Sequence, residues 1–363
     1  MSKSRDVMLK ICIVGAGQIA EAHIEEIKKI TETKIVGLCD LRVSPTQALA
    51  DKYQINNCYT SVDEMLKIEQ PDVVHITTPP GSHFTLALKS LNAGSSVYIE
   101  KPVTLIAKET AELIDLAKSK GLKLCSGTHR LKSTETKKVF EMISNTEHFG
   151  EMIHMDAVFG YNLSGIFGKL VTTNPDHWIA KLPGQLFQNN ISHPIAMLAP
   201  FLSDDLEITT LAYDRSKNGV VNDELRVQVL DKKNMTTASI LFTSNARPVQ
   251  FFVRYFGSKT TLNLNLTEHY WMEDSVSSFP GGLGLSLNIR TRAKLLSKQY
   301  WTNFKAFWLG RETFFSDMKE LFETFYFSIN NNSKEPILYE EVQRTSDIID
   351  VICEQINKQK DKS

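Results

Sequence analysis

The stretch that decides the fold is GAGQIA, Gly15–Ala20, which joins the apolar run LKICIVG to the helical pattern IAEAHIEEIKKI. Gly15, Gly17 and Ala20 occupy the small positions of a G-x-G-x-x-A turn. In such a turn the first glycine permits a tight bend, the second lets the backbone approach a pyrophosphate, and the small third residue lets the helix pack closely. The stretch therefore predicts a strand, a turn and a helix that together hold a dinucleotide.

The residues around this turn indicate which dinucleotide it would hold. The backbone amides at the start of the helix, at Gln18 and Ile19, are expected to face the phosphates. Asp40 ends the next β-rich run, 23 residues after Gly17, where an acidic side chain would bind ribose hydroxyls. A carboxylate repels the extra 2′-phosphate of NADP, so we predict NAD as the cofactor. Arg42 keeps NADP open as the less favoured alternative.

β-rich runs and helical patterns alternate through the first third of the chain. The runs KIVGLCD, PDVVHITTPP and SVYIEKP are separated by the helical patterns SPTQALADKY and HFTLALKSLNAG. This alternation is typical of right-handed βαβ units and predicts a parallel, doubly wound sheet in an α/β domain. Ser44 with Pro45 predicts one helix start, and Gly94 and Gly121 predict two helix ends.

Composition limits what the rest of the chain can be. With 363 residues and 42% hydrophobic residues, the chain has room for two domains with their own cores. Lys and Arg number 41 against 42 Asp and Glu, so no overall positive field attracts nucleic acid, and we predict no nucleic-acid partner. The N-terminus lacks the apolar core of a signal peptide, and no apolar run approaches the roughly 18 residues of a membrane helix. We therefore expect a cytoplasmic protein.

The cysteines point to the same compartment. They are five, an odd number, they lie mostly in apolar runs, and they show no CxxC spacing. This pattern predicts buried thiols in a reducing compartment, with no disulfide and no metal site. The residues are Cys12, Cys39, Cys58, Cys125 and Cys353.

Two further motifs end later β-rich runs. TTPPGSH covers Thr77–His83, and YIEKP contains Glu100, Lys101 and Pro102. The order G-x-G-x-x-A, T-P-x-x-x-H, E-K-P resembles the glucose–fructose oxidoreductase, inositol dehydrogenase and rhizopine-catabolism (Gfo/Idh/MocA) family of NAD(P)-dependent oxidoreductases. The resemblance is close over about the first 130 residues. It continues more loosely through GTHR (127–130), HFGEMIH (148–154) and GQLFQNNISH (184–193).

The resemblance implies two domains. The first is an NAD-binding Rossmann domain over residues 1–125, and the second is an α+β domain for substrate binding and oligomerisation over residues 126–363. The second domain is expected to contain an open, mainly antiparallel sheet, and its downstream segments alternate as half-exposed strands do. These segments are EMIHMDAVFGY, LEITTLAYD, LRVQVLD, TTASILFTS, VQFFVRYFG and TTLNLNL, before a final helix in YEEVQRTSDIIDVICEQI. A homodimer or homotetramer is expected.

The resemblance also implies roles for individual residues, with Lys101, His193 and Asn189 as the expected catalytic residues. Lys101 would point at the substrate hydroxyl or carbonyl and stabilise the developing alkoxide. His193 would take the hydroxyl proton, because an imidazole ordinarily has a pKa near neutrality. Glu100 is interpreted as an orienting or structural partner, and His83 as a brace of the T-P-x-x-x-H loop. The expected cofactor-binding residues are Gly15, Gly17, Gln18, Ile19, Asp40, Arg42, Thr78, Pro79, His83, Glu100 and Lys101.

The segment before His193 bears on the substrate. Asn189 lies four residues earlier, where many dehydrogenases of the family have aspartate, and an amide cannot store a proton. Asparagine here resembles the subset of the family that oxidises nucleotide-linked sugars for bacterial surface polysaccharides. Trp178 could stack on a sugar ring with His177 as a hydroxyl partner, although core packing of Trp178 is nearly as well supported. The expected substrate-binding residues are Lys101, His177, Trp178, Asn189 and His193; His23 and His75 are interpreted as structural.

Residues 281–311 are not explained by the family pattern. They contain six basic residues, no acidic residue and several aromatic residues. We rank subunit or domain packing first, a phosphate-rich substrate second, and contact with an anionic membrane third. Two alternatives to a sugar dehydrogenase also stay open: an NAD-dependent glycosidase that oxidises a ring carbon transiently, and a cofactor-binding regulator without turnover.

Overall fold

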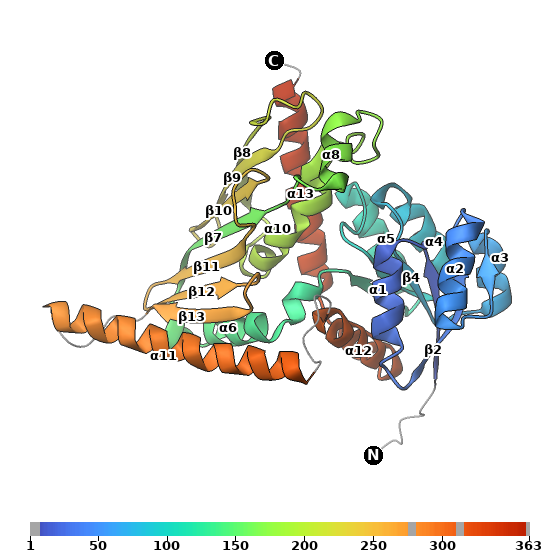
Figure 1. Ribbon diagram of the computed structural model, residues 1–363, viewed down its shortest axis with the longest axis horizontal. Helices are drawn as coiled ribbons and strands as arrows, with labels where there is room; N and C mark the ends of the chain where they lie inside the picture. The colour runs from blue at the N-terminus through green and yellow to red at the C-terminus, as the bar shows by residue number, and fades with distance from the viewer. Residues whose placement is uncertain (1–7, 275–280, 310–315, 361–363) are drawn as a thin grey trace. The chain divides into compact units, whose positions relative to one another are not determined.

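The computed structural model describes residues 8–274, 281–309 and 316–360. The chain divides into two compact units (Figure 1). The first unit comprises Met1–His129 and Phe315–Asp350, and the second comprises Arg130–Phe314 and Val351–Ser363. The domain boundary expected at residues 125 and 126 stays a prediction.

The first unit contains a parallel sheet of six strands in the order β3-β2-β1-β4-β5-β6. This is the strand order of a Rossmann fold, and it confirms the predicted doubly wound parallel sheet. The strands are β1 (Leu9–Val14), β2 (Thr33–Cys39), β3 (Cys58–Tyr59), β4 (Val73–Ile76), β5 (Ser96–Ile99) and β6 (Leu124–Ser126). The connecting helices are α1 (Gln18–Ile27), α2 (Val43–Tyr53), α3 (Val62–Glu69), α4 (His83–Asn92) and α5 (Ala107–Ser119).

The helix boundaries follow local signals closely, with one displacement. Gly94 and Gly121 both have positive φ and lie two residues beyond the ends of α4 and α5, as predicted. α2, in contrast, begins at Val43, before the predicted start at Ser44 and Pro45, and its N-cap residue Arg42 makes no side-chain cap. Arg42 carries only hydrogen-bond donors and so cannot cap the helix amides; its side chain donates to Asp40 instead.

Backbone hydrogen bonds extend past the strand ends at the carboxyl edge of this sheet. The amide of Gly15 donates to the carbonyl of Cys39 at 2.7 Å. In the same way Glu100 donates to Ile76 at 3.0 Å, so the residues after each strand remain tied to the neighbouring strand. The loops that carry the sequence motifs therefore start from fixed positions along one edge.

The chain returns to the first unit near its C-terminus. α12 (Ser316–Asn330) supplies Phe322, Phe325 and Tyr326, which are almost fully buried. Phe322 packs edge to face on Tyr98 of β5, with ring centroids 4.9 Å apart. This return has no counterpart in the predicted domain division, because a pattern of helical periodicity does not indicate which sheet a helix covers. The predicted final helix is confirmed as α13 (Tyr339–Lys360), in which Asp350 belongs to the first unit and Val351 to the second.

The second unit contains a sheet of seven strands in the order β13-β12-β11-β7-β10-β9-β8. Among the described strands of this sheet only β7 and β10 pair in parallel, so the predicted mainly antiparallel sheet is confirmed. The strands are β7 (Met152–Gly160), β8 (Leu206–Tyr213), β9 (Glu224–Asp231), β10 (Thr236–Thr243), β11 (Phe251–Gly257), β12 (Thr261–Asn265) and β13 (Tyr270–Asp274). The sequence did not predict β13.

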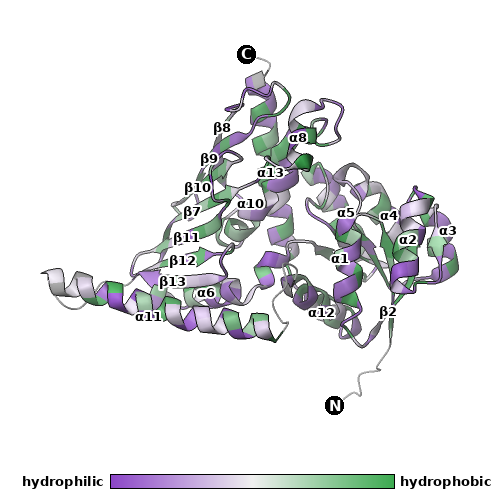
Figure 2. Cartoon of the chain, viewed as in Figure 1, coloured by the Kyte–Doolittle hydropathy of each residue, from purple (hydrophilic) through white to green (hydrophobic). Residues whose placement is uncertain are grey.

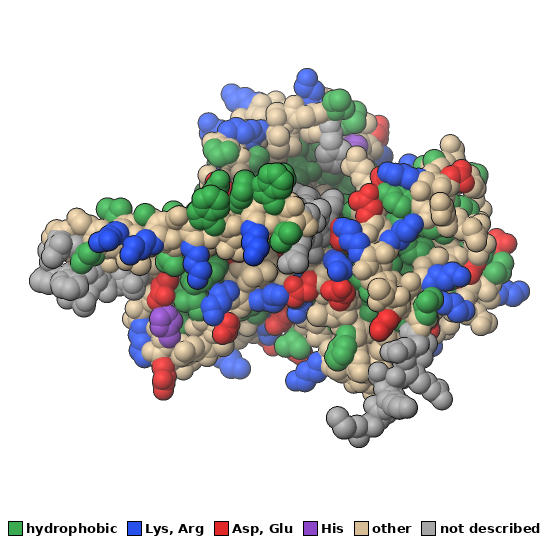
Figure 3. Space-filling model, turned by 60° about the horizontal axis from the view of Figure 1, so that its bottom comes forward, with side chains coloured by type: hydrophobic (Ala, Val, Ile, Leu, Met, Phe, Trp, Pro, Cys, Tyr) green, Lys and Arg blue, Asp and Glu red, His purple; other side chains and the backbone are tan. Residues whose placement is uncertain are grey.

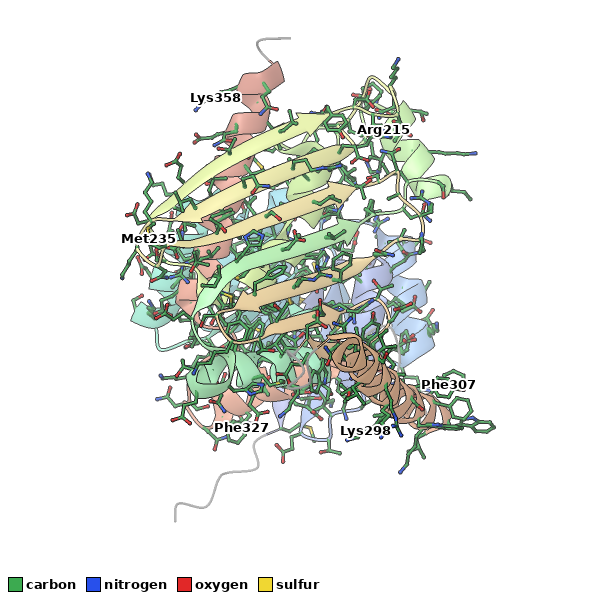
Figure 4. All side chains as sticks on the ribbon, turned by 90° about the vertical axis from the view of Figure 1, so that its left-hand side faces the viewer. Arg215, Met235, Lys298, Phe307, Phe327 and Lys358 are labelled. Carbon is green, nitrogen blue, oxygen red and sulfur yellow. The ribbon has the colours of Figure 1, made fainter. Side chains whose placement is uncertain are left out.

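Helices cover one face of the second sheet, and Figure 4 shows the other face open toward the viewer. α10 (Ser192–Leu198) packs on β7, β10 and β11 and is buried along most of its length. The other helices of this unit are α6 (Thr134–Ser144), α7 (Thr146–Phe149), α8 (Ile166–Thr173), α9 (Gln185–Asn190) and α11 (Gly281–Trp308). In Figure 2, α11 carries both hydrophilic and hydrophobic residues. None of the helices within the described ranges is long and apolar enough to span a membrane.

Candidate functional site

The turn after β1 has the geometry that its sequence predicts. Gly15 has φ +110°, and a Cβ there would lie 2.6 Å from Oγ1 of Thr77 and 3.1 Å from its carbonyl carbon. Gly17 caps α1, and a Cβ there would meet no described heavy atom within 4 Å. Gly15 is therefore required for the turn itself, whereas Gly17 leaves open space in front of the helix. That space fits a pyrophosphate at the helix N-terminus, where the exposed Gln18 and Ile19 follow.

Asp40 lies beside this turn, at the end of β2. Its Oδ2 accepts a hydrogen bond from the amide of Ala16 at 2.8 Å. Arg42 donates to both carboxylate oxygens, from Nε at 3.1 Å and from its terminal nitrogen at 3.2 Å. Burial opposes the ionised form of Asp40, but the hydrogen bonds from Arg42 and Ala16 outweigh it and lower the pKa of the carboxyl group. A charged carboxylate is thus fixed next to the turn, as ribose binding would require.

His83 ties two loops of the carboxyl edge together. The ring is fully buried, with Nδ1 2.9 Å from the carbonyl oxygen of Pro102 and Nε2 2.7 Å from that of Thr78. Burial lowers the pKa of His83, and the two carbonyl oxygens offset only part of this effect. The ring therefore links the loop that contains Thr78 and Pro79 to the E-K-P segment. This geometry is that of a brace, which is how the sequence was interpreted.

The E-K-P segment follows β5 directly. The peptide bond between Lys101 and Pro102 is cis. Glu100 is buried, and a Cβ at residue 127 would lie 3.0 Å from its Cα, so Gly127 makes room for it. Burial lowers the pKa of Lys101, while the negative charge of Glu100 partly opposes the shift. A lysine whose pKa is lowered at a sheet edge is suited to exchange a proton with a substrate hydroxyl.

Four polar side chains form a buried chain of hydrogen bonds behind this edge. His23 of α1 places Nε2 3.0 Å from Oε1 of Glu100. Its Nδ1 lies 2.9 Å from Nδ1 of His75 in β4, and Nε2 of His75 lies 2.8 Å from the hydroxyl of Tyr326 in α12. His75 also stacks on Tyr98, with ring centroids 4.8 Å apart. These hydrogen bonds connect side chains from three elements of the first unit, α1, β4 and α12, to Glu100.

Proton positions follow from this geometry. Because Glu100 is acceptor-only when ionised, Nε2 of His23 donates to it. One proton lies between the two facing Nδ1 atoms, and burial keeps the pKa of His75 well below its ordinary value, so His75 is neutral. Burial opposes the ionised form of Glu100, but the hydrogen bond and charge of His23 lead the interactions that lower the pKa of this carboxyl group. His23 and His75 thus hold Glu100 ionised beside Lys101.

The helical segment that carries the predicted proton acceptor lies in the second unit. His193 is half-buried at the start of α10, and its ring stacks on Phe159 of β7 with centroids 5.4 Å apart. Asn189 is half-buried in α9, whereas its neighbours Gln188 and Asn190 are buried. Asn190 donates to the carbonyl of Leu186 at 3.1 Å, and Gln188 accepts from an amide at 3.0 Å. Two of the three amides in QNNISH are therefore structural, and Asn189 is the one that shares the half-buried surface with His193.

His177 and Trp178 lie in the segment between α8 and α9. Trp178 is 37% exposed, so it is not a core residue, and its ring lies 5.8 Å from that of His177. Nδ1 of His177 accepts a hydrogen bond from the amide of Ile179 at 3.3 Å. The exposed indole is available to a ligand, and the role of both residues in substrate binding stays a prediction.

The structure thus gathers the predicted cofactor-binding residues at one edge of the first unit's sheet, and it places His177, Trp178, Asn189 and His193 in the second unit. Sequence reasoning missed that His23, His75 and Tyr326 act together on Glu100. The strand and helix patterns signalled that both histidines are interior, but nothing in the sequence signalled Tyr326, which lies 251 residues from His75.

One hollow of the first unit lies elsewhere. It is lined by residues of α3 and α4 and by Asp72 and Gly94, which precede β4 and β5. Ligands of open parallel sheets bind outside the carboxyl ends of the strands, and this hollow lies at the amino ends. We therefore assign it no part in the site.

Comparisons with known proteins agree with the Rossmann fold of the first unit. Residues 9–128 match the family model described as an oxidoreductase family with an NAD-binding Rossmann fold. D-glucoside 3-dehydrogenase of Escherichia coli strain K12 is 32% identical over 138 residues, which are 38% of this chain and 39% of that protein. The matched region is thus about two fifths of the length of that relative.

Solved structures extend the likeness in fold to the whole chain. Myo-inositol 2-dehydrogenase from Lactobacillus plantarum superposes with a TM-score of 0.71 at 18% identity, covering 97% of this chain and 98% of that one. The WlbA dehydrogenase from Bordetella pertussis, in complex with NADH and UDP-GlcNAcA, gives a TM-score of 0.78 at 15% identity, covering 98% and 97%. At these identities the likeness shows a shared fold.

The strand order, the glycine turn and the family match define an NAD(P)-binding Rossmann fold with a second, mainly antiparallel sheet. Over residues 9–128 the chain matches the model of the Gfo/Idh/MocA oxidoreductase family, in agreement with the resemblance that its ordered motifs indicated.

Substitution of the two glycines of the turn should affect different properties. Gly15→Ala should lower the free energy of unfolding by about 1–3 kcal/mol, because an alanine would be strained at φ +110° and would contact Thr77. Gly17→Ala should leave stability nearly unchanged but weaken binding of the dinucleotide, because its Cβ would enter only the open space. Chemical denaturation and a cofactor titration measure the two quantities. Equal loss of stability in both variants would contradict this assignment.

Glu100 predicts a dependence of stability on pH. The pKa of Glu100 is lower in the folded protein than the ordinary glutamate pKa of about 4.3. Its ionised form therefore contributes fully to the free energy of unfolding above that ordinary pKa, and this contribution is lost as pH falls through the lowered pKa. Glu100→Gln should therefore lower the free energy of unfolding by about 2 kcal/mol at neutral pH, and the difference from wild type should shrink in acid. The exposed Glu112→Gln serves as the control. A difference that does not vary with pH would show that Glu100 is not held ionised.

Proposed function

We propose that this protein is an NAD-dependent oxidoreductase that transfers a hydride between the nicotinamide and a hydroxyl-bearing carbon of a sugar. The observation that carries the proposal is the common edge of the first sheet, where the open turn at Gly17, the ionised Asp40 and the partly buried Lys101 lie in one unit. The matched relative from Escherichia coli is named a D-glucoside 3-dehydrogenase, which supports a sugar as substrate.

Lys101, His193 and Asn189 have different roles in the oxidation of the substrate hydroxyl group. Bound NAD would accept the hydride from the carbinol carbon, as nicotinamide cofactors do in dehydrogenases. Lys101 binds the hydroxyl oxygen and stabilises the negative charge that develops on it. His193 takes the hydroxyl proton, so the C–OH group becomes a carbonyl. Because Asn189 cannot store a proton, it orients the substrate by hydrogen bonding and leaves the acid–base work to Lys101 and His193.

Asp40 supports NAD over NADP. Its carboxylate stands beside the glycine turn, where it accepts ribose hydroxyls and repels a 2′-phosphate. Arg42, now engaged by Asp40, is the residue that would bind such a phosphate if the carboxylate were absent.

This proposal predicts a change of cofactor preference. Asp40→Ser should weaken NAD binding on the order of 10- to 100-fold, the effect of losing hydrogen bonds to a charged group, and should improve NADP binding. Asp51→Ser, on the exposed face of α2, is the control. Titrations of both cofactors measure the effect. If the Asp40 variant kept its NAD affinity, Asp40 would not contact the ribose.

A nucleotide-linked sugar is the proposed substrate class. Asn189 supports it through the resemblance to the family subset that serves polysaccharide synthesis. The likeness in fold to the WlbA dehydrogenase, whose structure contains UDP-GlcNAcA, adds support at the level of fold. A role in surface-polysaccharide metabolism, a cytoplasmic location and a homo-oligomeric state belong to the same proposal.

Turnover tests the proposal directly. The protein is incubated with NAD and a panel of free and nucleotide-linked sugars, including any sugar that copurifies with it, and NADH absorbance is followed. Lys101→Met and His193→Ala should each lower kcat by at least about 100-fold, the range for loss of a proton-transfer group, while NAD binding is retained. Asn189→Asp should fold normally and shift the pH profile or the sugar preference, because a carboxylate would raise the pKa of a nearby imidazole.

The alternatives give different results in the same assay. An NAD-dependent glycosidase would release its sugar without net NADH, because the ring carbon is reduced again. A regulator would bind NAD and show no turnover with any sugar. If Lys101→Met and His193→Ala leave turnover unchanged, the proposed roles are wrong.

A further inference from the structure

α11 is fastened to the edge of the second sheet by one of its faces. Gln299 makes two hydrogen bonds with the backbone of Trp271 in β13, accepting from its amide at 3.0 Å and donating to its carbonyl at 2.6 Å. Arg292 forms an ion pair with Asp274 at 2.8 Å. Asn303 donates to the carbonyl of His269 at 3.0 Å. These contacts hold the helix between residues 292 and 303, and they fix which face of that part turns toward the sheet.

An exposed aromatic ridge occupies the C-terminal half of α11. The rings contact each other, with Tyr300 and Phe304 stacked at 5.8 Å and Phe304 near Trp308 at 6.3 Å. Much of their surface is exposed, from 41% for Phe304 to 73% for Trp308. We define the aromatic ridge as Tyr300, Trp301, Phe304, Phe307 and Trp308. From sequence we ranked packing against a subunit or a domain first. Among the described residues, packing against the same domain leaves much of the ridge exposed.

A row of lysines runs beside the ridge. Lys294, Lys298 and Lys305 are spaced by four and seven residues, which places them on one face of the helix. All three are exposed, and no acidic residue occurs from 281 to 308. Figure 3 shows hydrophobic side chains gathered along one side of this helix with basic side chains next to them. In Figure 4 the labelled Lys298 and Phe307 both project from α11 away from the strands.

The spacing of these groups indicates the kind of partner. The three lysines extend over about 16 Å, at 1.5 Å per residue, on an open helix surface. A single diphosphate is too short to meet all of them, and there is no enclosing wall of described residues around them. A second copy of the chain carries almost no net charge, since its formal charge is −1. An anionic lipid surface, in contrast, presents negative charge along the whole row and an interface in which Trp and Tyr side chains reside.

We propose that α11 is a docking surface for anionic membranes, on which the helix lies flat. The aromatic ridge enters the boundary between headgroups and acyl chains, and the lysine row contacts acidic headgroups. Leu296 extends the apolar side, and it lines a hollow together with three ridge residues and with Tyr270 and Glu268. The helix does not cross the bilayer. This inference is independent of the proposed hydride transfer, because the surface lies on the second sheet's edge strand.

Vesicle sedimentation with the full chain tests the proposal. Wild-type protein should sediment with vesicles rich in phosphatidylserine, much less with phosphatidylcholine alone, and less in about 1 M salt, where charges are screened beyond about 3 Å. The triple change Lys294→Gln, Lys298→Gln and Lys305→Gln should weaken binding about 100-fold, or roughly fivefold per lysine. Trp301→Ser with Trp308→Ser should also weaken it, with less effect on the salt dependence.

A matched triple change controls for loss of charge alone. Lys169→Gln, Lys217→Gln and Lys233→Gln remove three exposed lysines from the same unit and should leave vesicle binding unchanged. NAD titration and circular dichroism show that each variant is folded. Equal effects of the two triple changes, or absence of binding to the acidic vesicles by folded wild-type protein, would overturn the proposal. So would a tryptophan variant that loses oligomer mass but keeps lipid binding, because the ridge would then be covered by a second copy.

Discussion

The feature on which the rest of the structure depends is the register of the parallel sheet at its carboxyl edge. Each backbone amide just past a strand donates to the strand beside it: Gly15 to Cys39, Thr77 to Val14, and Gly127 to Ile99. These bonds leave the motif loops little freedom where they begin. The glycine turn, the T-P-x-x-x-H loop and the E-K-P segment are therefore displayed together along one edge, although they are far apart in the sequence.

The structure also depends on a carboxylate, that of Glu100, which is buried behind the carboxyl edge of this sheet. A buried carboxylate such as Glu100 is expensive to desolvate unless donors surround it. His23 supplies the donor, His75 fixes the orientation of His23, and Tyr326 satisfies the far nitrogen of His75. The negative charge then limits the fall in the pKa of Lys101 that burial causes. Residues interpreted as structural thus control the charge next to the residue that we propose for catalysis.

The sequence was sufficient to predict features that depend on residues close together in the chain. Short-range geometry sets the turn at Gly15 and Gly17 and the position of Asp40 beside it, and strand periodicity predicted six of the seven strands of the second sheet. It was insufficient for long-range pairings. β13 is half-exposed throughout and has no alternation to detect, and the contact of Tyr326 with His75 depends on where α12 packs. The sequence showed that α11 is basic and aromatic, but only its hydrogen bonds to β13 reveal which face stays exposed.

The central claim is that NAD binds at the carboxyl edge of the first sheet. Hydrogen–deuterium exchange of backbone amides, with and without NAD, measures this claim most directly because each amide reports its own protection. Bound NAD should slow exchange at residues 15–20 and 77–83 and leave exchange at residues 281–308 unchanged. Unchanged exchange at residues 15–20 in the presence of saturating NAD would contradict it.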